Sequence, residues 1–350
     1  MLSITLEQML ERSVLDDSAS NAVDAVPPSG KAAALTLVPS SRVRRLRTAL
    51  SNMRTTARRV VPIERRFKCD AGSIGYVLYA PAIRTGGEAS LVVMLHGAGQ
   101  EATDFAAGTR MHAHADAVDT WVLYPSQSHD VPLRCWSWFA AHGQTRGHGE
   151  AALLAALTRS LVAEHDISPR RVYAAGLSAG AAMAIVLGQT YPDVFAAIGS
   201  HSGLPYGAAA DVFAALEVMA RGPADVPRPR RVTRIPTIVL HGDADRTVHP
   251  DNAHAIIDGL LAGGASARPP RSTRRGANGG DRAHTTITYR DSHERDCVEH
   301  WIVHDGGHAW FGGSADGSHT DPSGPDAAGA MLRFFHSHRL EPRCTQQASR

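Results

Sequence analysis

Short apolar runs alternate with longer stretches of helical periodicity from about residue 72 onward. Such short runs, rich in branched and aromatic side chains and bounded by turn residues, predict β-strands. The run 91–95 is apolar at every position, which is typical of a strand buried on both faces of a sheet. The predicted strands cover residues 74–79, 91–95, 120–124, 171–175, 196–199, 237–240, 286–290 and 298–304.

Helical patterns lie between several of these strands. The clearest one, 150–163, places Leu153, Leu154, Leu157 and Leu161 on one face. Strands that alternate with helices predict an α/β fold with a mostly parallel central sheet and helices on both faces. The stretch 267–282, with its prolines and glycines, predicts an exposed loop. The other predicted helices cover 179–190, 251–261 and 326–336.

The first seventy residues differ from the rest of the chain. A short amphipathic helix is predicted near residues 2–10, and the Pro/Ser/Gly sequence at 27–30 predicts a linker. Residues 42–68 then carry ten basic side chains against the single acidic residue Glu64. We expect 1–70 to form a partly disordered, Arg-rich arm, 71–340 to form one catalytic domain, and 341–350 to form a tail. The arm is either a solvated tail or a contact to an anionic surface such as a storage granule, a membrane or nucleic acid.

Composition narrows the class of protein. Of the 350 residues 43% are hydrophobic and 20% are charged, as in ordinary soluble globular proteins. The apolar runs are far shorter than the roughly 20 residues of a membrane helix, so no transmembrane segment is expected. A formal net charge of +2 does not point to nucleic acid as a partner.

The cysteines indicate neither zinc nor a disulfide scaffold. They are few and widely spaced, without a CxxC pair, although one bridge remains possible. No continuous apolar stretch of signal-peptide length stands near the start of the sequence, so we expect a cytoplasmic protein, with association to a granule left open. Secretion by a non-classical route stays open. The four cysteines are Cys69, Cys135, Cys297 and Cys344.

The strongest chemical signal is the sequence GLSAG at 176–180, between a predicted strand and a predicted helix. A G-x-S-x-G motif in this setting is a nucleophile elbow, in which the glycines make room for a strained turn and the serine projects above the sheet. Ser178 is therefore the candidate nucleophile. A serine needs a base, and the base needs an acid to orient it.

The acid and the base are expected downstream of Ser178, at the ends of later strands. The sequence HGDAD follows the strand 237–240, and Asp245 is the preferred acid, whereas Asp243 is expected to shape the turn. The sequence GGHAW follows the strand 298–304 and makes His308 the candidate base. The strand 91–95 leads into HGAGQ, where backbone N–H groups of Ala98 and Ala179 are candidate oxyanion donors. A simple turn is the alternative for this loop.

Together these motifs resemble the α/β-hydrolase esterases of the poly(3-hydroxybutyrate) depolymerase type, which include feruloyl and acetylxylan esterases. The resemblance runs from about 74 to 338. It implies a Ser178–Asp245–His308 triad, no metal, no cofactor and no large lid domain. The motifs that carry it are HGAGQ at 96–100, RCWSWF at 134–139, GLSAG at 176–180, HSGLPYG at 201–207, HGDAD at 241–245, GHAW at 307–310 and TDP at 320–322.

The resemblance also implies an aromatic crevice and one departure. Trp136 and Trp138 match the crevice positions and either contact substrate or pack in the core. Trp310 follows the candidate base and either lines the site or fixes the histidine loop. Many relatives have cysteine where Ala98 stands, so a disulfide from that position is lost and Cys135 is expected to be a free thiol.

The sequence thus predicts a serine esterase, foremost a poly(3-hydroxybutyrate) or short-chain polyhydroxyalkanoate depolymerase or oligomer hydrolase. A feruloyl or acetylxylan esterase is the alternative within enzymes. A granule-associated binding protein with little activity is the alternative of another class, suggested by the basic arm. The expected partner is an ester substrate, and neither the acyl chain length nor the oligomeric state follows from the sequence.

Overall fold

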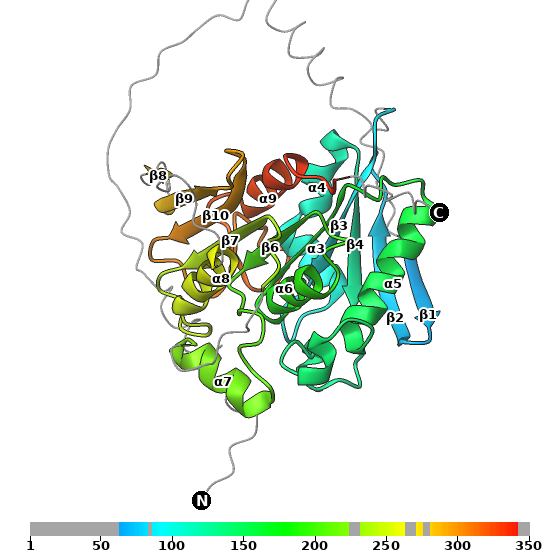
Figure 1. The fold of residues 1–350 in the computed structure, drawn as a ribbon, viewed down its shortest axis with the longest axis horizontal. Helices are drawn as coiled ribbons and strands as arrows, with labels where there is room; N and C mark the ends of the chain where they lie inside the picture. Colours follow the sequence, from blue (N-terminus) through cyan, green and yellow to red (C-terminus); the bar gives the residue numbers. More distant parts are fainter. Residues whose placement is uncertain (1–62, 83–85, 224–231, 263–270, 276–280, 342–350) are drawn as a thin grey trace, which may run out of the picture.

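The computed structural model describes residues 63–82, 86–223, 232–262, 271–275 and 281–341. One sheet of ten strands runs through this part of the chain in the order β1-β2-β4-β3-β5-β6-β7-β10-β9-β8 (Figure 1). The strands are β1 (Ile63–Cys69), β2 (Gly72–Tyr79), β3 (Ser90–Leu95), β4 (Thr120–Ser126), β5 (Val172–Leu177), β6 (Ala197–His201), β7 (Thr237–Gly242), β8 (Arg271–Arg275), β9 (His284–Arg290) and β10 (Asp296–Val303).

The middle of the sheet is parallel, from β4 across to β10, and antiparallel strands close both edges. This confirms the predicted mostly parallel sheet. Because parallel strands end at the same edge, the loops after β3, β5, β7 and β10 are brought to one side of the molecule. A short parallel ladder, β11 (Trp310–Phe311) with β12 (Thr320–Asp321), follows the loop after β10.

Helices cover both faces of the sheet. Helices from distant parts of the sequence share a face, because the right-handed crossovers between parallel strands place them on one side of the sheet or the other. The helices of the first face are α5 (Gly149–Glu164), α6 (Ala179–Thr190), α7 (Val212–Arg221) and α8 (Asp251–Leu261), and those of the second are α3 (Ala102–Thr109), α4 (Met111–Ala115) and α9 (Ala327–His336). Three 3₁₀ turns complete the described elements: η1 (Asp116–Val118), η2 (Pro132–Arg134) and η3 (Ala141–Gln144).

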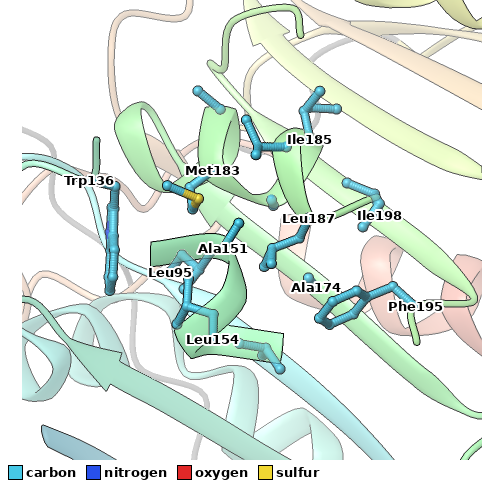
Figure 2. Packing of buried hydrophobic residues seen from close by; sticks show 14 of the residues in the cluster. Leu95, Trp136, Ala151, Leu154, Ala174, Met183, Ile185, Leu187, Phe195 and Ile198 are labelled. Atoms are coloured by element: carbon cyan, nitrogen blue, oxygen red, sulfur yellow. The ribbon is translucent and has the colours of Figure 1, made fainter. Parts of the chain in front are cut away.

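Two hydrophobic cores result, one on each face. In β3 the alternation is direct, since Leu91, Val93 and Leu95 face one core while Val92 and Met94 face the other. Figure 2 shows the first core, where side chains of α6 pack among residues of β3, α5 and β6. A strand buried on both faces explains the continuous apolar run in the sequence.

The predicted arm ends earlier than residue 70. Residues 63–69 form β1, an edge strand antiparallel to β2, so this part of the arm belongs to the sheet. Half-buried positions of β1 stand among exposed charged residues, so the sequence carries no clear strand signal. One of its arginines, Arg65, pairs with Glu164 of α5 at 2.8 Å. The remaining predictions for the arm, and the tail 342–350, lie outside the described residues.

The stretch 267–282 is not a loop throughout. Residues 271–275 form β8, which pairs with β9 in the register Thr273↔Thr286. The sequence of this strand, RSTRR, is polar throughout and carries no apolar alternation, so it does not distinguish a strand from a loop. Among the described residues, no helix has the length and apolar character that a bilayer crossing requires.

Candidate active site

Ser178 stands in the turn between β5 and α6 with φ 55° and ψ −119°, a conformation that is strained for a residue with a side chain. The two flanking glycines make that turn possible. A Cβ on Gly176 would lie 2.5 Å from the carbonyl oxygen of Leu95, and a Cβ on Gly180 would overlap the same oxygen. The motif therefore lets α6 pack tightly against the end of β3, as in a nucleophile elbow.

The backbone of Ser178 is fixed on both sides of the turn. Its N–H donates to the carbonyl of His201 at 2.9 Å, and its carbonyl accepts from Ala182 at 2.9 Å within α6. The residue is 9% exposed. Its side chain thus stands at the edge where the parallel strands end, next to the positive end of α6.

Asp245 and His308 are joined by a hydrogen bond of 2.7 Å between Oδ2 and Nδ1. The other carboxylate oxygen, Oδ1, accepts from the N–H groups of Thr247 and Val248, both at 2.9 Å. The carboxylate side chain has no exposed surface, and the imidazole is 8% exposed. The acid is therefore held from its own loop and offers one oxygen to the histidine.

The charge of Asp245 is stabilised although the group is buried. Burial by itself would raise the pKa of the carboxyl group, but the charge of His308 and hydrogen bonds from His241 and His308 lower that pKa below its usual range. His241 approaches Oδ2 at 3.3 Å. An ionised carboxylate on Nδ1 leaves Nε2 of His308 as the basic nitrogen of the ring.

Asp243 makes a second aspartate–histidine pair in the same two loops. Its Oδ2 lies 2.8 Å from Nδ1 of His304, and its Oδ1 accepts from the N–H of Asp305 at 2.7 Å. The Asp243 side chain is 42% exposed. The contact to a backbone N–H therefore links the loop after β7 to the loop after β10.

Close backbone packing brings the loops after β7 and β10 together. A Cβ on Gly242 would overlap the carbonyl oxygen of Gly306, and that same oxygen accepts from the N–H of Ala244 at 3.1 Å. The N–H of Asp243 donates to Val303 at 3.0 Å. The positions of Asp245 and His308 are thus set by main-chain contacts as well as by their own hydrogen bond.

The loop after β3 is held from several sides. The N–H of Gly97 donates to Oε1 of Gln100 at 3.0 Å, and the amide nitrogen of Gln100 donates to Asp104 and Ser318. Among the described residues, the N–H groups of Ala98 and Ala179 have no hydrogen-bond acceptor. Two free N–H groups near Ser178, one from a loop and one from the start of α6, are the arrangement expected of oxyanion donors.

The exposed fractions of the three candidate tryptophans decide between the alternatives that the sequence left open. Trp136 has no exposed surface, and Trp310 and Trp138 are 1% and 4% exposed, so the structure does not support substrate contact and favours the core alternative. Trp136 instead donates from Nε1 to the carbonyl of His96 at 2.9 Å, and Trp310 stacks on His201. Full burial leaves these rings to fix the loops after β3 and β10.

Sequence reasoning missed several residues that hold these loops. His96 directly follows β3 and His201 ends β6, and each accepts a backbone N–H on Nε2, from Gln127 and Phe311, at 3.1 Å. Glu150 holds Ser137 through its N–H and hydroxyl at 2.6 and 2.8 Å. The two histidines stand inside motifs at strand ends, which is a usable signal, whereas nothing in the spacing marks Glu150.

The thiol next to this site is unpaired. Cys135 is free, as are Cys69 and Cys297 among the described residues, which agrees with the expected loss of a disulfide at this loop. Burial raises the pKa of the Cys135 thiol to about 12, so it is not a nucleophile. Within the described part of the chain, no group of three or more histidine, cysteine, aspartate or glutamate side chains could hold a metal ion.

Comparisons with known proteins agree with this geometry. Residues 74–268 match the family model described as "Esterase PHB depolymerase". Poly(3-hydroxyalkanoate) depolymerase C of Paucimonas lemoignei is 35% identical over 49% of this chain and 44% of its own, and feruloyl esterase B of Neurospora crassa is 30% identical over 46% and 60%. The chain therefore spans about half the length of these curated relatives.

The fold also matches solved structures. An acetyl xylan esterase from Aspergillus awamori superposes with a TM-score of 0.59 at 17% identity, covering 75% of this chain and 94% of that one. At this identity the likeness concerns the fold alone. The parallel sheet, the elbow after β5 and the helices on both faces are those of an α/β-hydrolase.

Proposed function

Because the chain belongs to the esterase PHB depolymerase family, we propose that it is a serine hydrolase of carboxylic esters whose triad is Ser178, Asp245 and His308. The observation that carries this proposal is the hydrogen bond between the buried Asp245 and His308. It lies at the same edge of the sheet as the strained turn that presents Ser178. Acid, base and nucleophile follow the chain order that this fold uses.

The reaction proceeds through an acyl-enzyme. Nε2 of His308 takes the proton of the Ser178 hydroxyl as its oxygen attacks the ester carbonyl. The N–H groups of Ala98 and Ala179 donate to the developing oxyanion. Asp245 keeps Nδ1 of His308 protonated and stabilises the imidazolium, which then gives its proton to the leaving alcohol. Water, activated in the same way, releases the acid and restores the serine.

The preferred substrate class is a short-chain polyhydroxyalkanoate, as polymer or as oligomers, which two depolymerase relatives support. Feruloyl or acetyl esters are the second candidate, because feruloyl esterases and an acetylxylan esterase also stand among the relatives. The free thiols of Cys69, Cys135 and Cys297 favour a reducing compartment, so we place the reaction in the cytoplasm, at a granule surface or on released oligomers.

Replacing Ser178 by alanine tests the proposal. We expect kcat for a soluble butyrate ester to fall on the order of 10⁴–10⁶-fold, because the nucleophile is lost while the fold remains. The measurement compares wild type and Ser178→Ala on this ester, on amorphous poly(3-hydroxybutyrate), and on feruloyl and acetyl esters. Circular dichroism and thermal unfolding control for folding.

The substrate panel separates the candidates. Serine-dependent hydrolysis of the polymer supports a depolymerase, and hydrolysis restricted to 3-hydroxybutyrate oligomers supports an oligomer hydrolase. Faster serine-dependent turnover of feruloyl or acetyl esters would move the assignment to that class. Binding to granules without turnover of any ester would contradict the proposal and favour the binding protein.

A further inference from the structure

His96 lies at the end of β3, between the core and the loop that carries Ala98. Its side chain is fully buried and both ring nitrogens have partners. Nε2 accepts the backbone N–H of Gln127 at 3.1 Å, and Nδ1 lies 2.8 Å from the carbonyl oxygen of Gly97. The proposed reaction assigns no role to this histidine.

These two contacts determine where the proton of the ring is. A backbone N–H can only donate, so Nε2 of His96 must present its lone pair to Gln127. The proton of the neutral ring therefore sits on Nδ1 and is donated to the oxygen of Gly97. Burial lowers the pKa of His96 to about 4, so the ring remains neutral near pH 7.

The oxygen that His96 holds belongs to the same peptide unit as the N–H of Ala98. This peptide is trans, since no described peptide bond is cis, and in a trans peptide the C=O and the N–H point in opposite directions. Fixing the oxygen of Gly97 therefore fixes the direction of the Ala98 N–H. The N–H of Gln100 also donates to this oxygen, at the longer distance of 3.2 Å, and closes the turn.

The neighbouring residues show in which direction the N–H of Ala98 must point. Gly97 packs beside the nucleophile, where a Cβ on it would lie 3.7 Å from Cβ of Ser178. If the peptide rotated by half a turn, the oxygen of Gly97 would replace the N–H and repel an oxyanion. Such a rotation would also leave Nδ1 of a fully buried histidine without an acceptor, which is costly.

We propose that His96 is a positioning residue that holds the Gly97–Ala98 peptide with its N–H toward the oxyanion of the reaction. This inference rests on the proposed function, because it assigns a purpose to the Ala98 N–H. It separates the two ring nitrogens by role. The Nε2 contact to Gln127 ties β3 to the loop after β4, whereas the Nδ1 contact to Gly97 sets up the transition-state donor.

Two substitutions separate these roles. In His96→Asn the amide nitrogen replaces Nδ1 and can still donate to Gly97, but the acceptor for Gln127 is lost. In His96→Gln the amide oxygen replaces Nε2 and can accept from Gln127, but the donor to Gly97 is lost. Both variants are compared with wild type on a soluble butyrate ester and with a fluorophosphonate, which reacts with the serine and places an oxygen in the oxyanion site.

We expect kcat of His96→Gln to fall roughly 10²-fold with KM little changed, as for removal of one oxyanion donor. The rate of phosphonylation of Ser178 should fall in parallel. His96→Asn should keep most of both rates, although its melting temperature can drop as much as that of His96→Gln. The order of activity then differs from the order of stability, which a structural role alone would not produce.

Equal activity of wild type and His96→Gln at saturating ester would overturn the inference, as would equal losses in the two variants that follow their melting temperatures. Labelling of wild-type Ser178 keeps this outcome distinct from failure of the proposed function. A wild type that turns over no ester but is labelled at Ser178 still compares the variants by their labelling rates. A wild type whose Ser178 is not labelled would overturn both proposals.

Discussion

Two aspartate–histidine pairs lie in the same two loops, and they differ in burial and not in chemistry. Asp245 has no exposed side-chain surface, whereas the side chain of Asp243 is 42% exposed. A buried carboxylate with several donors stabilises an imidazolium much more strongly than an exposed one, because water screens the exposed pair. This difference in burial is the reason to propose Asp245 and His308, and not Asp243 and His304, as the catalytic pair.

Replacing each aspartate by asparagine tests this assignment at the residue scale. Asp245→Asn should lower kcat roughly 10⁴-fold, because the amide favours the wrong tautomer of His308. Asp243→Asn keeps an acceptor for the N–H of Asp305 and should leave kcat within about threefold, as expected for an exposed pair. Steady-state kinetics on one soluble ester give both values, and the reverse ranking would transfer the role to Asp243.

At this scale the sequence identified residues whose chemistry is tied to a motif and a chain order. Ser178 sits between two glycines that only an elbow requires, and Asp245 and His308 follow strands in the order that the fold prescribes. The sequence could not decide the role of the tryptophans, because the residues around such a ring are the same whether it faces solvent or the core. The role of His96 depends on two backbone partners, Gln127 and Gly97, that only the fold brings to it.

Elements show the same division between strong and weak patterns. The strands buried on both faces and the helices α5, α6 and α8 were predicted close to their observed bounds, because continuous apolar runs or an apolar helix face define them. The edge strands β1 and β8 were missed, since their sequences are mostly polar and carry no such signal. Helix α7 was also missed, although Asp211 caps it by accepting from the N–H of Ala214 at 2.9 Å.

Two glycines in helices of the same face should respond to alanine in opposite ways. In α6 a Cβ on Gly180 would overlap the carbonyl oxygen of Leu95, so Gly180→Ala should cost about 3 kcal/mol or more. In α8 a Cβ on Gly259 would only touch Val232 at 3.8 Å, so Gly259→Ala should stabilise the protein by about 0.5–1 kcal/mol. Thermal unfolding measures both.

The Gly259→Ala variant should melt about 2 °C higher than wild type with unchanged kcat, as a gain of this size implies for a domain of this length. Gly180→Ala should melt many degrees lower or fail to accumulate as folded protein. A Gly180→Ala variant with the stability of wild type would mean that α6 does not pack against the end of β3 as described.

Several histidines are buried and neutral in or next to the parallel strands of the sheet. His96, His201 and His300 are at most 2% exposed, and burial is the main reason that the pKa of each lies below its usual value. The pKa is about 4 for His96 and about 3 for His300. Each ring lies at or near a strand of the parallel sheet, so protonation would affect the packing of the entire sheet.

This arrangement predicts a loss of stability in mild acid. A histidine in the unfolded chain takes up its proton near pH 6.5, whereas these folded histidines do so only near pH 4 or below. Between these values the unfolded state binds more protons, so the free energy of unfolding falls as pH falls, by up to about 1.4 kcal/mol per pH unit for each buried histidine. Carboxylates such as Asp193 affect stability only at a lower pH, since hydrogen bonds from Arg146 hold the pKa of Asp193 at about 2.

Melting temperatures at pH 7.5, 6.5, 5.5 and 5.0 measure this effect, and we expect them to fall steeply below pH 6.5. His336 on α9 tests the cause, since burial lowers its pKa to about 4 and it lies 3.0 Å from the hydroxyl of Thr120, away from the catalytic loops. His336→Gln should flatten the pH dependence, whereas His293→Gln, at an exposed position, should leave it unchanged. A melting temperature that stays constant from pH 7.5 to 5.0 would contradict the neutral state of the buried rings, including that of His96.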